Sequence, residues 1–341
     1  MTALRTMSPA EDDLIASPLG RSAQRRERSL VRLGPQVATI VVHYRHDDDT
    51  IRCLNSLQAS ENANQELIVV DNTEPEYAGA DLADLLDPTV RLIRSGDNVG
   101  FAGGCNIGIR AALETPVEFI WLVNPDAVVG AETLTRMLAA AEEHPDAGII
   151  GCRILDGGHP ARILFNGGVI EGKGSTYHAD AGKFDPSVPD DAVRDVDYVT
   201  GACFLIRRDV LRQIQLLSED YFLYYEETDY CLRAQRAGWR TVIAPRARAW
   251  HYKRSSGKYP PAHYIYYMCR NRMHFSQRFF SASFEEIVAE LQPFIAGWTN
   301  QVTTHAPHLV GDFEKIVQLA LSDGREGRLG RRDDIGDFAF T

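Results

Sequence analysis

The sequence has no run of about 18 apolar residues that could span a bilayer, and its N-terminus lacks the apolar stretch of a secretory signal. These absences predict a cytoplasmic protein without a transmembrane helix. No two cysteines are spaced as Cys-x-x-Cys, so a structural zinc site is not expected. The six cysteines lie far apart and mostly within apolar stretches, which predicts reduced core residues rather than disulfides.

An excess of positive charge is also missing. The 36 Lys and Arg residues are outnumbered by 47 Asp and Glu, which gives a formal net charge of −11. Because general nucleic-acid binders are usually basic, no nucleic-acid partner is expected. Residues 230–284 nevertheless contain no Asp or Glu and eleven basic residues. This segment predicts a positive surface for phosphate groups or an anionic membrane, or else a solvated basic helix face.

The 341 residues, 44% of them apolar, are enough to bury a sizeable core. Polarity and hydrophobic patterning divide the chain into four parts. We expect a disordered leader at 1–35, a main domain at 36–260, a helical extension at 261–322 and a flexible tail at 323–341.

Strand and helix patterns alternate along the first half of the main domain. Largely apolar, β-branched runs predict buried strands at 37–44, 67–70, 90–93, 118–123 and 147–153, with helical patterns between them. This alternation predicts an α/β fold with a parallel sheet and helices on both faces. Ligands of such sheets bind beyond the carboxyl ends of the strands. Here those ends carry polar clusters at 43–44, 71–72, 95–98 and 124–126.

Two of these clusters suggest a phosphate ligand. The glycine-rich stretch at 96–106 would let a ligand approach the backbone closely, although it matches neither a dinucleotide fingerprint nor a P-loop. The alternative is a tight strand–helix turn. Asp126, in Asn124-Pro-Asp126, would lie at the tip of a buried strand and could hold a divalent cation against a diphosphate. Asn-Pro-Asp is also ordinary turn chemistry.

Two further clusters lie in the second half of the chain. Glu226 and Glu227 come directly before or within the first turn of a predicted helix, and Asp229 is placed to pair with Arg233 one turn later. An acid beside other acids and aromatic rings should have the raised proton affinity of a general base. Helix capping with a surface salt bridge is the alternative. His251 follows a strand and precedes a basic loop, where it is either a metal ligand or a structural residue.

Six segments in this order resemble the family 2 glycosyltransferases of the GT-A fold, especially bacterial rhamnosyltransferases and galactofuranosyltransferases. The resemblance covers about residues 37–280 and rests on 70–72, 98–106, 124–126, 201–208, 225–233 and 250–251. It implies a GT-A type, mostly parallel nucleotide-binding sheet flanked by helices, with a C-terminal helical extension. Residues 36–150 would form the nucleotide-sugar half of the catalytic domain, and 151–260 the acceptor half.

The resemblance also implies roles for individual residues. Glu227 would be the catalytic base, and Asp126, Asn124 and His251 would bind Mg²⁺ or Mn²⁺. The nucleotide-binding residues would be Tyr44, Asp71, Asn98, Gly100, Phe101, Gly104 and Asn106. Residues near the acceptor or the diphosphate would be Gly201, Ala202, Glu226, Asp229, Lys253 and Lys258.

Three positions depart from the common pattern of the family. Asn124 replaces an acidic first metal ligand, Glu227 replaces the more usual Asp, and Arg45 stands where many relatives carry Asn. The predicted function is an inverting, metal-dependent glycosyltransferase that uses a dTDP- or UDP-sugar, with L-rhamnose as the leading sugar. A glycan, a lipid-linked glycan or a small natural product would supply the acceptor hydroxyl.

Two other functions compete with this one. A sugar-nucleotide pyrophosphorylase should carry a glycine-rich basic signature after the first strand, where this chain has residues 43–49 without a glycine. A non-catalytic nucleotide-sugar-binding protein of similar fold would not need Asp126, Glu227 and His251 together.

The basic segment also has aromatic residues in its later part, at 259–280. One hypothesis is that it docks on the inner membrane face, as a peripheral contact, or grips a polyprenyl-diphosphate acceptor. In the alternative, its aromatic residues pack against the catalytic domain or a second subunit of a homodimer. Arg270, Arg272 and Arg278 would then stay solvated.

Overall fold

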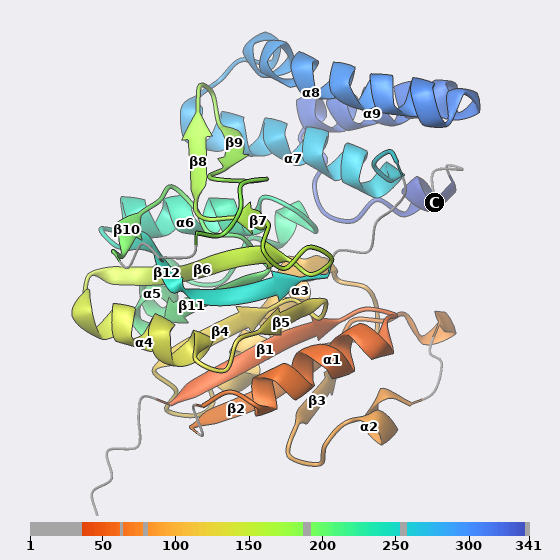
Figure 1. Ribbon diagram of the computed structural model, residues 1–341. Coiled ribbons are helices and arrows are strands. Elements are labelled where there is room, and N and C mark those ends of the chain that lie inside the picture. The colour runs from red at the N-terminus through yellow and green to blue at the C-terminus, as the bar shows by residue number, and fades with distance from the viewer. Residues whose placement is uncertain (1–35, 62–63, 78–80, 187–191, 253–257, 338–341) are drawn as a thin grey trace, which may run out of the picture. The chain divides into compact units, whose positions relative to one another are not determined.

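Four parallel strands form the first half of a mixed, ten-stranded sheet (Figure 1). The computed structural model describes residues 36–61, 64–77, 81–186, 192–252 and 258–337, so the predicted leader and Lys253 lie outside the described residues. β1 is buried at every position, as its apolar, β-branched sequence predicts. The elements of this half are β1 (Val37–His43), α1 (Asp47–Gln58), β2 (Gln65–Asp71), α2 (Leu82–Leu85), β3 (Arg91–Arg94), α3 (Gly100–Ala112) and β4 (Phe119–Val123).

The second half of the sheet is mixed in direction. β11 is antiparallel to both β4 and β6, whereas β12 is parallel to β6, and β8 and β9 form a separate hairpin. The strand order is β10-β12-β6-β11-β4-β1-β2-β3, with β5 paired to β12 and β7 to β6. The elements are β5 (Ala127–Val129), α4 (Thr133–Glu143), β6 (Ala147–Asp156), β7 (Ile163–Phe165), β8 (Gly168–Glu171), β9 (Ser175–His178), β10 (Arg194–Asp195), β11 (Cys203–Arg207), α5 (Arg208–Ile214), α6 (Glu226–Arg236) and β12 (Arg240–His251). The predicted α/β class with a mostly parallel sheet is confirmed.

β12 includes His251, which was expected to follow the strand rather than to belong to it. It continues through Pro245 by a register shift between Ala244 and Arg248, and its last residues pair with β5. The proline hides this continuation in the sequence because proline normally ends a ladder. The extension carries His251 to the end of β4.

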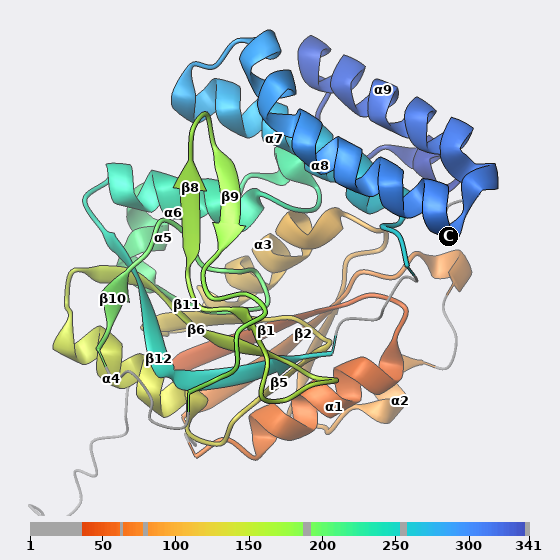
Figure 2. The same ribbon diagram turned by 45° about the horizontal axis from the view of Figure 1, so that its top comes forward.

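Three helices form the predicted C-terminal extension, and Figures 1 and 2 show them side by side. They are α7 (Ala262–Phe280), α8 (Phe284–His305) and α9 (Val310–Glu326). Ser283 and Glu286 form a reciprocal capping box at the start of α8. Within the described part of the chain, none of the helices combines the length and apolarity needed to cross a bilayer.

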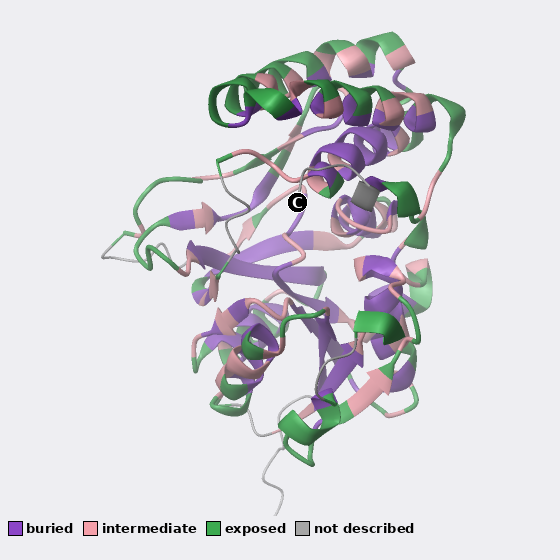
Figure 3. Cartoon of the chain, turned by 90° about the vertical axis from the view of Figure 1, so that its right-hand side faces the viewer, coloured by how far each residue is buried: buried purple, intermediate pink, exposed green. Residues whose placement is uncertain are grey.

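Burial separates the sheet from the outer helices. Figure 3 shows most strands of the sheet as buried and the outermost helical faces as exposed, while β3 is only partly buried. In α8 only Ile287, Leu291 and Val302 are buried, so most of this helix faces solvent. All six cysteines are buried and none forms a disulfide, as predicted.

Two of the three arginines at 259–280 do not contribute to a charged surface. Arg270 and Arg272 are 1% and 2% exposed, and Tyr266, Tyr267 and Phe275 are also buried. Arg270 donates to the carbonyl of Tyr221, while Arg272 pairs with Glu290 at 2.5 Å. The expectation that these two arginines stay solvated is therefore wrong, and neither offers a free cation to a membrane. Both guanidinium groups bind partners inside the protein, because a buried charged group requires hydrogen-bonding partners.

The predicted flexible tail at 323–341 also needs correction. α9 continues to Glu326, and the Asp323 side chain is fully buried. Arg328 and Arg332 both pair with this carboxylate. A buried carboxylate needs such partners, so the polar residues that suggested a tail hold the chain in place instead.

Candidate active site

Asp126 and His251 lie together although 125 residues separate them in the sequence. The turn at 124–126 joins β4 to β5, and antiparallel pairing places Ala127 opposite His251. His251 Nε2 is 2.8 Å from Asp126 Oδ1, and the Tyr252 N–H donates to the Asp126 carbonyl at 2.8 Å. Pairing of β5 with β12 therefore brings two of the three proposed metal ligands into contact.

The third proposed ligand lies at the same strand end. Asn124 Oδ1 is buried and accepts no hydrogen bond from the residues that the structure describes. The described chain contains no group of three His, Cys, Asp or Glu side chains able to enclose a metal. These residues fit an ion such as Mg²⁺, which commonly takes one or two protein carboxylates and completes its shell with phosphate oxygens and water. Such an ion would therefore need phosphate or water oxygens besides these side chains.

A strained turn precedes the two glutamates. Phe222, Tyr224 and Tyr225 have φ angles of 63°, 69° and 76°, which are unfavourable for bulky residues. The buried Asn271 of α7 holds this turn, because its Nδ2 donates to the carbonyls of Tyr221, Leu223 and Tyr224 at 2.7–3.0 Å. Sequence reasoning missed Asn271, since nothing in its local pattern indicates partners 47 to 50 residues away.

Glu227 lies at the start of α6, beside the loop that enters β11. Its carboxyl carbon is 4.0 Å from the position that a β-carbon on Gly201 would occupy. The Asn124 N–H donates to the Ala202 carbonyl at 2.9 Å, which ties the end of β4 to the same loop. The structure therefore gathers Gly201, Ala202 and Glu227 close to the strand end that carries Asp126.

Burial dominates the electrostatics of the glutamate pair. It raises the pKa of Glu227 from 4.5 to about 7, although backbone N–H groups, including that of Gly201, act in the opposite direction. Burial and the neighbouring Glu227 charge raise the pKa of Glu226 further. One buried oxygen of each carboxyl group, Oε2, has no hydrogen-bond partner among the described residues. Burial and its neighbour thus favour the protonated form of Glu226, and Glu227, with a pKa of about 7, is the member that can exchange a proton.

Asp229 does not join this pair. Its side chain is fully buried and accepts hydrogen bonds from Tyr221 at 3.1 Å and Arg233 at 2.6 Å. Arg278 of α7 lies 3.1 Å from its second oxygen. The carboxylate is satisfied by the interior of the protein, so its predicted place near the acceptor is not supported. The paired Arg233 was predicted, but the partner from α7 was not.

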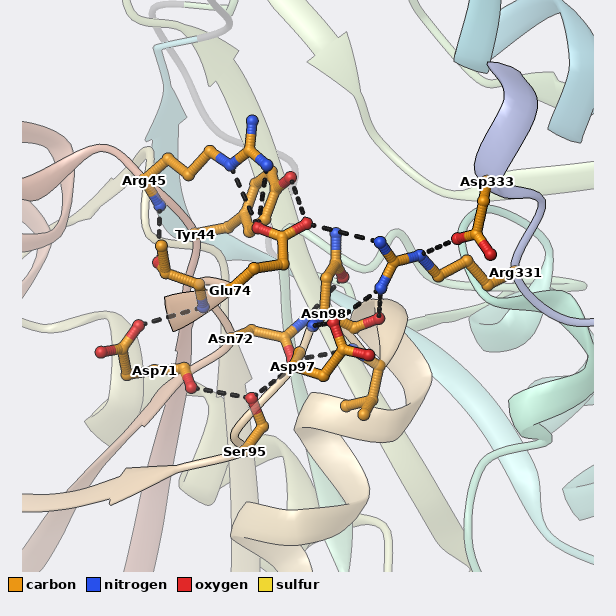
Figure 4. Close-up of polar contacts among 12 residues, drawn as sticks. Tyr44, Arg45, Asp71, Asn72, Glu74, Ser95, Asp97, Asn98, Arg331 and Asp333 are labelled. Atoms are coloured by element: carbon orange, nitrogen blue, oxygen red, sulfur yellow. Dashed lines mark hydrogen bonds and ion pairs between the residues drawn. The ribbon is translucent and has the colours of Figure 1, made fainter. Parts of the chain in front are cut away.

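The predicted nucleotide residues meet at the ends of β1, β2 and β3 (Figure 4). The Tyr44 hydroxyl donates to Glu74 Oε1 at 3.3 Å, and Arg45 Nη2 donates to Glu74 Oε2 at 2.9 Å. Burial raises the pKa of Tyr44 above its usual value, so its hydroxyl keeps its proton near pH 7. Glu74 is only 4% exposed and was missed by sequence reasoning. Arg45 stands where many relatives carry Asn, and its ion pair with Glu74 gives a structural reason for arginine at this position.

Asp71 and Asn98 lie at the same edge. Asp71 Oδ1 accepts from the Thr73 N–H at 3.1 Å, and its carbonyl accepts from Ser95. Asn98 Oδ1 accepts from Asn72 and from the Gly100 N–H at 3.1 and 3.0 Å. These bonds fix the turn before α3 beside Tyr44, which brings together Tyr44, Asp71 and Asn98 as predicted.

The first residues of the glycine-rich stretch pack against the strained turn before α6. Gly100 has φ +77° and a β-carbon there would lie 2.3 Å from the Phe222 carbonyl, so this position requires glycine. The Phe101 N–H donates to that carbonyl at 2.8 Å, and the Phe101 ring packs against Gly201. These contacts join the nucleotide end to the strained turn.

Gly104 and Asn106 have structural partners instead. A β-carbon on Gly104 would lie 2.6 Å from Val42 of β1, so this glycine permits close packing of α3 on the sheet. Asn106 is 1% exposed and bonds the backbone N–H and C=O of Leu217 and the Glu219 carboxylate. Their predicted contacts with the nucleotide are not supported, because both positions are occupied by the protein itself. Lys258 is exposed.

The family model described as "Glycosyltransferase like family 2" matches residues 35–273. A similar curated protein is the Haloferax volcanii "Low-salt glycan biosynthesis hexosyltransferase Agl10", 29% identical over 269 residues, or 77% of this chain and 82% of that protein. Another is the Mycobacterium tuberculosis "N-acetylglucosaminyl-diphospho-decaprenol L-rhamnosyltransferase", 30% identical over 202 residues, which cover 52% of this chain and 63% of the relative.

Solved structures support the same fold. GalNAc-T7, solved with UDP, GalNAc and Mn²⁺, has a TM-score of 0.56 at 13% identity, with 80% of this chain and 59% of that chain covered. The Pyrobaculum calidifontis mannosyltransferase PcManGT, solved with GDP-Man and Mn²⁺, has a TM-score of 0.51 at 13% identity over 86% of this chain and 87% of that chain. At this identity the likeness concerns the fold, which confirms the predicted GT-A architecture.

Proposed function

The chain belongs to the glycosyltransferase-like family 2, and from this premise we propose that it is an inverting, metal-dependent hexosyltransferase. The donor is a dTDP- or UDP-linked sugar, with L-rhamnose as the leading sugar. The acceptor is a hydroxyl group of a glycan, a lipid-linked glycan or a natural product. The names of the haloarchaeal hexosyltransferase and the mycobacterial L-rhamnosyltransferase favour a hexosyl donor and a lipid-linked acceptor.

One observation carries the proposal. Glu227, the titratable carboxyl group of the site, lies against Gly201, and the adjoining Ala202 is hydrogen-bonded to the strand end that holds Asp126. The proposed proton acceptor and the proposed cation-binding carboxylate thus lie on either side of the loop that contains Gly201 and Ala202. A transferase needs both, because a proton leaves the acceptor while negative charge develops on the diphosphate.

In the proposed reaction the ionised Glu227 carboxylate removes the proton from the acceptor hydroxyl. The acceptor oxygen forms a bond to the anomeric carbon while the bond from that carbon to the diphosphate oxygen breaks. Glu226, kept neutral by burial and by Glu227, does not compete for the proton. Attack from the face opposite the diphosphate inverts the anomeric configuration.

Asp126 and His251, with Asn124, would hold a divalent cation at the diphosphate. When bound, such a cation neutralises charge that develops on the leaving group. Their position at the ends of β4 and β12 agrees with the Mg²⁺ or Mn²⁺ requirement that we propose. Both structural neighbours were solved with Mn²⁺, which also supports a divalent metal.

Tyr44, Asp71 and Asn98 would receive the nucleoside, with Gly100 and Phe101 beside the sugar. The paired, buried Glu74 would orient the Tyr44 hydroxyl. A cytoplasmic location, peripheral membrane contact and a homodimer stay predictions.

The proposal is tested by incubating purified protein with a panel of nucleotide sugars and following release of nucleotide diphosphate. Each donor is assayed with Mg²⁺, with Mn²⁺ and with excess chelator, in the presence of lipid-linked and free glycan acceptors. We expect release from a dTDP- or UDP-sugar that requires both metal and acceptor. Equal release in chelator would contradict metal dependence, and no release from any donor would contradict the proposed activity.

A further inference from the structure

The segment that follows α9 returns to the nucleotide end of the domain. Residues 328–335, called here the C-terminal clasp, are held by the fully buried Asp323. Arg328 Nε and Arg332 Nη1 donate to the two oxygens of this carboxylate at 2.6 and 2.7 Å, and the Tyr266 hydroxyl donates at 2.6 Å. The clasp is therefore fixed to α7 and α9 independently of any contact with the sheet.

Backbone contacts then set which residue of the clasp points toward the sheet. The Gly330 N–H donates to the Asp220 carbonyl at 2.8 Å, and the Arg332 N–H donates to the Tyr267 hydroxyl at 3.0 Å. Arg331 lies between these two anchored positions. Its backbone therefore has little freedom, and its side chain extends over the turn between β3 and α3 (Figure 4).

Arg331 contacts three residues at this end of the domain, each of them at least 233 positions away in the sequence. Its Nη1 donates to Asp97 Oδ1 at 2.7 Å and to the Asn98 carbonyl at 3.1 Å. Its Nη2 lies 3.7 Å from Glu74 Oε1, the oxygen that accepts from Tyr44. On the solvent side, Nε pairs with Asp333 at 2.7 Å.

We propose that Arg331 is a positioning residue for the nucleoside diphosphate of the donor and that the C-terminal clasp completes this end of the donor site. The inference rests on the proposed function. Arg331 holds the Asn98 turn and the Glu74 carboxylate, and these in turn place Asn98 and Tyr44 for the nucleoside. It does not react with the sugar, so its role lies in donor affinity rather than in the chemical step.

Charge gives Arg331 a second effect on the same ligand. Glu74, Asp97 and Asp333 carry three negative charges, and among the described residues the positive charges paired with them are Arg45 and Arg331. Loss of Arg331 leaves this rim with one more uncompensated negative charge. A nucleoside diphosphate is an anion and would be repelled by that change.

If Arg331 contributed to folding alone, its replacement would lower stability and leave nucleotide affinity unchanged. The Arg331 side chain is 36% exposed, and exposed ion pairs add little to stability. The clasp is already anchored by Asp323, which Arg331 does not touch. Replacement of Arg331 should therefore change nucleotide binding much more than the midpoint of unfolding.

The test compares Arg331→Gln with Arg212→Gln, which removes the same charge from an exposed ion pair on α5. Calorimetric binding of UDP and dTDP is measured together with donor KM, kcat and the unfolding midpoint. For Arg331→Gln we expect Kd and donor KM to rise about tenfold, the effect of losing one charged hydrogen bond of about 1.4 kcal/mol. The kcat should stay within about twofold, and Arg212→Gln should match the wild type.

Arg331→Lys keeps the charge but cannot make the forked contacts, so its affinity should lie between those of the wild type and Arg331→Gln. It also serves if Arg331→Gln does not fold. Wild-type affinity in both variants, or a fall in kcat without a rise in Kd, would overturn the inference alone. Failure of the wild type to bind either nucleotide would overturn the proposed function and the inference with it.

Discussion

Replacement of Glu227 by Gln should abolish most activity while making the protein more stable at alkaline pH. The amide keeps the size of the side chain but cannot ionise or accept the acceptor proton. We expect turnover to fall by at least about a hundredfold, as is usual for loss of a general base. Nucleotide binding should be retained, because Glu227 lies beside Gly201 and not at the nucleoside end.

The stability gain follows from the pKa of Glu227, which burial raises from 4.5 to about 7 in the folded protein. Below about pH 4.5 the carboxyl group is protonated in both states, and its ionisation costs no stability. As the pH rises toward 7 the unfolded chain ionises first, so the free energy of unfolding falls. Each unit of difference between the folded and unfolded pKa is worth about 1.4 kcal/mol once both states are ionised. Glu227 therefore lowers the free energy of unfolding by about 3 kcal/mol at pH 8 and by about 1 kcal/mol at pH 5.

Urea unfolding of the wild type and Glu227→Gln at pH 5 and pH 8 measures this difference, with Glu114→Gln as the control for an exposed glutamate in an ion pair. The variant should be more stable by about 3 kcal/mol at pH 8 and by about 1 kcal/mol at pH 5. The wild-type kcat/KM should decline as the pH falls below about 7, because the base becomes protonated. A gain that does not depend on pH, or near wild-type turnover of the variant, would refute the assignment of Glu227.

Three further predictions concern the neighbouring residues. Asp126→Ala and His251→Ala should each raise the metal concentration needed for half-maximal activity, and full activity of the wild type in excess chelator would disprove this role. Asp229→Asn should lower the free energy of unfolding by about 1.5–3 kcal/mol, since it weakens the hydrogen bonds that the buried carboxylate accepts from Tyr221 and Arg233, and a loss below about 0.5 kcal/mol would contradict its structural role. Asn106→Ala should cost about 2–3 kcal/mol in urea unfolding but leave donor KM within about twofold, whereas a selective rise in KM would restore its predicted nucleotide contact.

The strands of the sheet could be predicted from the sequence because the pattern that indicates each strand lies within that strand. The continuous apolar run of β1 and the helix that starts near Asp47 each follow from neighbouring residues. The polar residues at the strand ends could be predicted for the same reason, since a strand that stops also marks one edge of the sheet. Tyr44, Asp71 and Asp126 lie at such strand ends, and their position follows from the sequence alone.

Residues whose roles depend on distant partners could not be found in this way. Asn106 lies in a stretch that looks like a ligand loop, but its partner Leu217 is 111 residues away. The polar composition near Arg331 suggested a flexible tail, and its contact with Asp97 spans 234 residues. In both cases packing between elements decides which side chain is satisfied by the protein and which is left for a ligand.

The stereochemistry of transfer tests the central account most directly. With a donor identified by nucleotide release, the one-bond C–H coupling at the anomeric carbon of the product is measured by NMR and compared with that of the donor. Direct attack by an acceptor that Glu227 deprotonates predicts the opposite anomeric configuration in the product. Retention of the donor configuration would contradict a single displacement and the role of Glu227 as its base.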